Sequence, residues 1–163
     1  MTILSYTRNT AIIMNTIDIV CGAEERKAKL LPLLNGNIFH VTSFEALDTL
    51  IEEGIIKHNR EGKLKYSYPQ SKISYGNMKG FICLFDFRDI KASDICWSNR
   101  KYSIFSRDVF LLLQDKYWID IIRPQDRHLS IKEMYIPESE VWYPRDIETT
   151  KIETCIRVMS PVV

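Results

Sequence analysis

The chain has 163 residues, of which 22 are basic and 21 acidic, so its formal net charge is +1. This near balance gives no general affinity for nucleic acids or membranes, although it leaves room for a local basic groove. The length suits a single domain, and an apolar content of 45% predicts an ordered core. No run approaches the ~20 apolar residues that span a bilayer, and the N-terminal stretch lacks the basic head of a signal peptide. We therefore expect a cytoplasmic protein that does not enter a membrane.

The cysteines are scattered, with no CxxC pair and no histidine at metal-ligand spacing, so no metal site is expected. Their even number permits two disulfides, but the scatter favours reduced, partly buried thiols. The chain also lacks a phosphate-binding loop, a dinucleotide-binding glycine motif, a zinc-protease motif and a nucleophile elbow. Cys83 lies in the most apolar run, where a thiol is expected to be inert. The four cysteines are Cys21, Cys83, Cys96 and Cys155.

The first 35 residues are predicted to form an N-terminal helical extension. Residues 1–20 suit either a helical face or a strand, because isoleucines and threonines recur in them. Residues 23–34 fit a helix better, since their acidic residues come first and their basic residues follow. Pro32 is expected to kink or end that helix.

Residues 37–54, NIFHVTSFEALDTLIEEG, read as a strand followed by a capped helix. The strand covers residues 38–41, and Thr42 and Glu45 have the spacing of a capping box. Apolar residues then recur on one helical face, and Gly54 can adopt the left-handed conformation that ends a helix. His40 is expected at the junction between the strand and the helix, a common place for side chains that bind ligands. Its simpler interpretation is a hydrogen bond that ties down the strand end.

The next part of the chain alternates polar and apolar stretches. Residues 57–72 are rich in basic residues and carry two tyrosines, which suits an edge strand, a solvated loop or a loop that grips an acceptor. Residues 71–80 contain two glycines and read as a turn-rich connection. They lead into residues 81–87, an apolar run typical of a buried central strand. Residues 88–107 show no strong period and read as a surface connection.

Strands are predicted to dominate the C-terminal third. Residues 109–113 suit a buried strand or a short helix, since periodicity does not separate the two. A tight turn at residues 115–116 predicts a hairpin with residues 117–122. Short strands are then expected at residues 131–136, 140–143 and 152–158, the last at the sheet edge. Helices first and strands afterwards predict a single α+β domain.

Two carboxylates flank Ser139 in this region. In an extended chain Glu138 and Glu140 point the same way, about 7 Å apart. Like charges on one face of a strand entrance would raise the pKa of at least one of the two carboxyl groups. The simpler interpretation is a solvated strand end with two ordinary carboxylates.

These stretches together resemble the ADP-ribosyltransferase superfamily. IFHVTSFEALDTLIEEGII, residues 38–56, is similar to the first motif of the DNA-modifying toxins of the DarT type, in which a strand ends in a polar residue and a helix runs to a glycine. SEVWYPRDIETTKIETCIRV, residues 139–158, is similar to the closing segment, in which a catalytic glutamate opens a strand. SKISYGNMKGFICLFDF, residues 71–87, occupies the position of the second motif. The pattern is closest to the diphtheria-toxin-like branch that uses His, Tyr and Glu.

The resemblance implies a fold, a reaction and a set of residues. The fold would be a split, antiparallel-rich central sheet with flanking N-terminal helices. The reaction would move ADP-ribose from NAD, the cosubstrate, to a nucleic acid or protein acceptor, in a toxin or defence effector that an inhibitor or antitoxin protein restrains. Glu140, His40 and Tyr75 would be the catalytic residues, and Glu138, from the ESE sequence similar to an E-x-E motif, would contact the acceptor. NAD would be bound by His40, Val41, Thr42, Tyr75 and Arg88, with Val41 standing where many members have glycine.

Each implied residue has a chemical role. Cleavage of the nicotinamide–ribose bond passes through an oxocarbenium-like state, which a carboxylate such as Glu140 stabilises. His40 would hydrogen-bond a ribose hydroxyl, and Tyr75 would stack on the nicotinamide ring. Two alternatives stay open: an RNA 2′-phosphotransferase of the same general plan, and a catalytically silent nucleotide- or protein-binding module.

Overall fold

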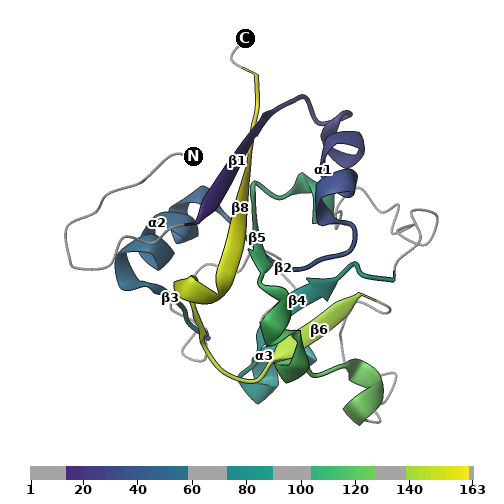
Figure 1. Cartoon of the computed structure of the whole chain (residues 1–163), viewed down its shortest axis with the longest axis vertical. Helices are drawn as coiled ribbons and strands as arrows, with labels where there is room; N and C mark the ends of the chain where they lie inside the picture. Colours follow the sequence, from purple (N-terminus) through teal and green to yellow (C-terminus); the bar gives the residue numbers. More distant parts are fainter. Residues whose placement is uncertain (1–13, 59–72, 90–103, 128–138, 162–163) are drawn as a thin grey trace.

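A mostly antiparallel six-stranded sheet forms the centre of the protein (Figure 1). The computed structural model describes residues 14–58, 73–89, 104–127 and 139–161. Every pair of neighbouring strands in this sheet is antiparallel except the first, which is parallel. In spatial order the strands are β1 (Asn15–Val20), β8 (Ile152–Met159), β5 (Val109–Leu113), β2 (Ile38–Thr42), β4 (Ile82–Asp86) and β6 (Glu140–Tyr143). A second, two-stranded sheet pairs β3 (Ile55–Ile56) with β7 (Ile147–Glu148).

Two apolar clusters cover the two faces of the main sheet. The first packs α1 (Arg26–Leu34) on a face that includes Phe39 and Phe85. The second packs α2 (Phe44–Glu53) on a face that includes Ile38 and Leu111. Neighbouring residues of one strand enter different clusters because successive side chains point to opposite faces. The result is an α+β architecture, as the order of the predicted elements indicated.

The smaller elements lie mainly at the ends of the strands. They are the short helix α3 (Tyr75–Lys79) and the 3₁₀ helices η3 (Ile104–Ser106), η4 (Asp115–Asp120), η5 (Pro124–Arg127) and η6 (Thr149–Lys151). None of the described helices is long and apolar enough to cross a membrane.

The N-terminal part of the chain contributes a strand to the sheet. Residues 15–20 form β1 and pair in parallel with β8, whereas the prediction placed them in a helical extension. An ion pair adds to this contact, with Arg157 Nε 2.6 Å from Asp18 Oδ1. Because β1 covers β8, β8 is not the edge strand that the sequence indicated. Of the predicted extension over residues 1–35, the helical part is Arg26–Leu34, and residues 1–13 lie outside the described residues.

The first helix accommodates its proline close to its end. Pro32 lies inside α1, which continues for only two more residues and stops at Leu34. Proline lacks the N–H that would donate to the Ala28 carbonyl, and its ring crowds that carbonyl, so it disfavours continuation of the helix. Gly36, at a φ of 80°, then turns the chain into β2.

The cap of α2 lies one residue later than predicted. The N-cap is Ser43, whose hydroxyl accepts a hydrogen bond from the Ala46 N–H at 3.2 Å. Thr42, the predicted cap, is instead the last residue of β2 and pairs with Val109 of β5. The predicted stop is confirmed, since Gly54 ends the helix at a φ of 71°.

The structure decides between helix and strand for the remaining segments of the chain. Residues 75–79 form a helix inside the predicted turn-rich connection, with Ser74 as its cap and Gly80 at a φ of 79°. β4 is the central strand that the apolar run predicted, and β5 is a strand in which all five residues are buried. β6 begins at Glu140, as predicted.

The hairpin predicted after residue 114 is wrong. Residues 115–120 form the 3₁₀ helix η4, which begins with a bond from the Tyr117 N–H to the Gln114 carbonyl at 3.0 Å. The Trp118 indole then donates to the Leu113 carbonyl at 3.1 Å. That bond folds the segment back on the end of β5, so it cannot extend into a second hairpin strand.

Candidate functional site

Glu140 opens β6 in a buried position. It pairs with Phe85 of β4 and is 5% exposed. The indole N–H of Trp142, two residues further along the same strand, donates to Glu140 Oε1 at 2.9 Å. A buried carboxylate needs such donors, because burial without hydrogen bonds would strongly disfavour its charged form.

Tyr75 packs against the same tryptophan. It is the first residue of α3 and 6% exposed, and its ring centroid lies 4.8 Å from that of Trp142. Gly76 leaves room for this contact. A Cβ at that position would come within 2.5 Å of Trp142 Nε1 and 2.8 Å of Cys83 Sγ. The first turn of α3 is therefore in direct contact with the indole that holds Glu140.

Cys83 lies beside this group, opposite Trp142 in the β4–β6 ladder. Burial raises the pKa of its thiol far above the usual range, and the nearby Glu140 carboxylate raises it further. The Ser74 hydroxyl, 4.0 Å from Sγ, opposes this only in part. The thiol is thus protonated at neutral pH and is no nucleophile, as its place in an apolar strand predicted.

His40 makes a hydrogen bond to the backbone of the neighbouring strand. Its Nδ1 lies 3.0 Å from the Cys83 carbonyl oxygen, and a carbonyl only accepts, so Nδ1–H is the donor. Burial lowers the pKa of His40, and this hydrogen bond opposes the shift only in part. The ring is therefore neutral at pH 7, with Nε2 as an acceptor.

The strand register separates His40 from Glu140. His40 pairs with Leu111 of β5, whose side chain belongs to the cluster under α2. Glu140 pairs with Phe85, whose side chain belongs to the cluster under α1. The two predicted residues therefore lie on different faces of the sheet, and β4 lies between their strands. Tyr75 and Glu140 come together around Trp142, and His40 is joined to them through the backbone of Cys83.

The two residues that follow His40 are buried. Val41 is part of the apolar cluster under α1, and Thr42 is 6% exposed at the end of β2. Their side chains fill the interior, so any contact that they make with a ligand in this conformation is through their backbone.

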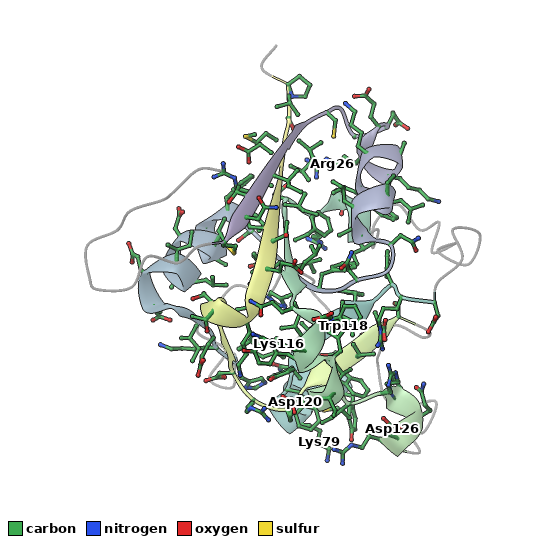
Figure 2. All side chains as sticks on the ribbon, viewed as in Figure 1. Arg26, Lys79, Lys116, Trp118, Asp120 and Asp126 are labelled. Carbon is green, nitrogen blue, oxygen red and sulfur yellow. The ribbon has the colours of Figure 1, made fainter. Side chains whose placement is uncertain are left out.

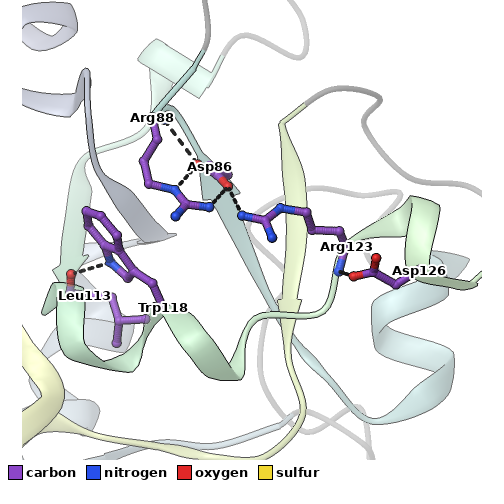
Figure 3. A network of polar contacts seen from close by, with 6 residues as sticks. All are labelled: Asp86, Arg88, Leu113, Trp118, Arg123 and Asp126. Atoms are coloured by element: carbon purple, nitrogen blue, oxygen red, sulfur yellow. Dashed lines mark hydrogen bonds and ion pairs between the residues drawn. The ribbon is translucent and has the colours of Figure 1, made fainter.

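Arg88 is held in an ion pair (Figure 3). Its Nε and Nη2 donate to the two carboxylate oxygens of Asp86 at 2.9 and 2.6 Å, and its guanidinium lies over the Trp118 ring at 5.0 Å. Arg123 Nη2 reaches the same carboxylate at 3.4 Å. Burial alone would raise the pKa of Asp86, but the hydrogen bonds and charge of Arg88, with the charge of Arg123, hold it below its usual value. Two cations thus share one carboxylate at this end of β4.

A second cluster of polar side chains connects η4 to the C-terminal end of β6. Trp118 and Asp120 of η4 are labelled in Figure 2. The Tyr143 hydroxyl donates to Asp120 Oδ2 at 2.8 Å, and Arg145 reaches the same oxygen at 2.7 Å. Burial, together with the Asp120 carboxylate, raises the pKa of Tyr143 to about 12. The phenol is therefore neutral at pH 7 and serves as a structural donor.

Glu138, the predicted acceptor contact, lies outside the described residues, and so does the basic stretch 59–72. Sequence reasoning missed two residues at the site, Trp142 and Gly76. Trp142 could have been found from the two-residue spacing that puts it on the same strand face as Glu140. Nothing in the sequence distinguishes Gly76 from a turn glycine.

No group of three or more His, Cys, Asp or Glu residues in the described parts of the chain could hold a metal ion. Comparison with protein-family models, curated proteins and solved structures found no match to this chain.

Proposed function

We propose that this protein is a mono-ADP-ribosyltransferase that transfers ADP-ribose from NAD to a nucleic acid or protein acceptor. The observation that carries the proposal is the buried Glu140 carboxylate at the opening of β6, held by the Trp142 indole. The arrangement of the strands gives further support. The stretches that resemble the three family motifs contribute β2, β4 and β6, which are neighbours in the sheet.

A carboxylate is the group that this reaction needs. Positive charge grows on the ribose as the bond to nicotinamide breaks, and a fixed carboxylate stabilises that charge without reorganising. Glu140 would also accept the proton of the acceptor's attacking group. Trp142 already holds one of its oxygens, so the carboxylate is oriented before NAD binds.

The other predicted residues take narrower roles. His40 would accept a hydrogen bond from a ribose hydroxyl at Nε2. This nitrogen is an acceptor because Nδ1 carries the proton that is donated to the Cys83 carbonyl. Because strand alternation turns His40 toward the other face, the bond-breaking step is assigned to Glu140 alone. Tyr75 contributes by packing on Trp142, and Arg88 would offer NAD only the N–H groups that Asp86 leaves unused.

Nicotinamide release tests the proposal. We expect the purified protein to release nicotinamide from NAD when DNA, RNA or protein acceptors are present. Glu140→Gln keeps the shape and removes the charge, so the rate should fall by about 10²–10³-fold, the range seen when one transition-state contact is lost. The matched control is Glu153→Gln, which makes the same change at an exposed position of β8.

Two results would contradict the proposed ADP-ribosyltransferase activity. One is a wild-type protein that neither binds NAD nor releases nicotinamide with any acceptor class. The other is a Glu140→Gln variant as active as Glu153→Gln. Turnover of a 2′-phosphorylated RNA in the absence of NAD cleavage would instead identify an RNA phosphotransferase.

A further inference from the structure

We propose that Trp142 is a positioning residue for Glu140, and that α3 in turn fixes the position of Trp142. This inference rests on the proposed function, because it explains how the carboxylate assigned to the reaction is kept in one orientation. It adds a residue that neither the motifs nor the expected chemistry pointed to.

The first step is the hydrogen bond. Trp142 is 0% exposed and Glu140 5% exposed, and the indole nitrogen lies 2.9 Å from Oε1. An indole N–H only donates, so it binds the ionised carboxylate better than the neutral acid. Hydrogen bonds to a charged group are about twice as strong as neutral ones, and the burial of both side chains limits competition from solvent.

The second step is what holds the indole. The Tyr75 ring packs on it, with centroids 4.8 Å apart, and the missing side chain of Gly76 lets the backbone of α3 approach. α3 is itself fixed at both ends, by the Ser74 hydroxyl that accepts from the Asn77 N–H at 3.3 Å and by Gly80 in the left-handed region. These contacts with Tyr75 and Gly76 restrict movement of the indole toward α3.

Replacing the donor should therefore disturb Glu140 more than it disturbs the fold. In Trp142→Phe we expect kcat for nicotinamide release to fall by about 10-fold or more while KM changes little, since the interaction acts on the carboxylate and not on bound NAD. The acid limb of the rate profile should move to higher pH, because a carboxylate that has lost a donor protonates more readily. A merely structural tryptophan would lower the amount of folded protein without moving that limb.

A readout independent of activity separates this inference from the proposed function. The side-chain carboxyl carbon of Glu140 can be followed by NMR as pH is changed. We expect its titration midpoint to rise by about one pH unit in Trp142→Phe, the size of one charge-assisted hydrogen bond. Trp118→Phe is the matched control, because that indole donates to the Leu113 carbonyl and should leave the midpoint unchanged.

A second substitution guards against misfolding of Trp142→Phe. The analogue β-(3-benzothienyl)alanine at position 142 keeps the bicyclic shape and lacks the N–H, so it should shift the midpoint as Trp142→Phe does. An unchanged midpoint in either folded variant overturns the positioning role, even if the wild type releases nicotinamide. A shifted midpoint in a protein that never cleaves NAD leaves Trp142 as the residue that holds Glu140 and removes the proposed function instead.

Discussion

His40 shows how a single residue couples burial, protonation and stability. The neutral ring donates from Nδ1 to the Cys83 carbonyl, and burial lowers its pKa below the value of about 6.5 that an unfolded chain has. Between the folded and the unfolded pKa, the unfolded state binds more protons than the folded state. The free energy of unfolding must therefore rise with pH across that window and fall as the solution becomes more acidic.

His40→Gln should weaken this acid sensitivity. The amide can still donate to the Cys83 carbonyl but does not titrate. We expect the wild type to lose stability between pH 7.5 and pH 5.5, and the variant to lose less over the same interval. Urea unfolding at both pH values measures the difference, and the interval from pH 7.5 to 8.5, in which His40 does not titrate, is the control. Equal losses in the two proteins would mean that His40 is not the neutral, hydrogen-bonded group described.

The sequence predicted the position of Glu140 better than that of His40. A glutamate at the start of a strand follows from local pattern and is confirmed. The prediction that His40 ends its strand is wrong, because β2 continues to Thr42 and His40 is its middle residue. The ion pair between Arg88 and Asp86 could not be predicted, because it depends on side-chain geometry that a local sequence pattern does not contain. The same is true of Gly76, whose importance comes from a ring 66 residues further along the chain.

At the scale of elements, competing local signals were decided by tertiary contacts. Thr42 and Ser43 are both good cap residues, and the pairing of Thr42 with Val109 left the cap to Ser43. Residues 15–20 fitted both a helix and a strand. They form a strand because they pair with one side of β8, while β5 pairs with the other side. Elements with one dominant signal, such as β4 and the glycine stop of α2, were predicted correctly.

The cap of α2 gives a direct test at this scale. Ser43→Ala removes the acceptor for the Ala46 N–H and should lower the free energy of unfolding by about 1 kcal/mol. Thr49→Ala is the control, since Thr49 is an exposed interior residue of the same helix. There alanine has the higher helix propensity, so stability should stay equal or rise slightly. A smaller loss at Ser43 than at Thr49, measured by denaturant unfolding, would place the cap elsewhere.

Across the whole molecule, the strand order determines which residues can meet. β2, β4 and β6 are neighbours, so three stretches separated by some 40–60 residues in the chain come together. The sequence indicated the strands but not their register. Register decides the face of every side chain, because a shift of one residue moves each of them to the other side of the sheet. That is why the placement of His40 and Glu140 on different faces could not be predicted.

The strand order also predicts how stability is distributed over the sheet. β5 lies between β8 and β2, and all five of its residues are buried. Within the described parts of the chain, β1 pairs on one side only, and it has three exposed and three partly exposed residues. We therefore expect β5 amides to exchange with solvent only through global unfolding, whereas β1 amides exchange through a smaller opening that leaves the rest of the sheet intact. Native-state hydrogen exchange at increasing urea measures both. The free energy of exchange should depend steeply on urea for β5 amides and only weakly for β1 amides. The expectation would be contradicted if β1 amides exchanged as slowly, and with as steep a urea dependence, as β5 amides. That result would show that β1 and the central strands open as one unit.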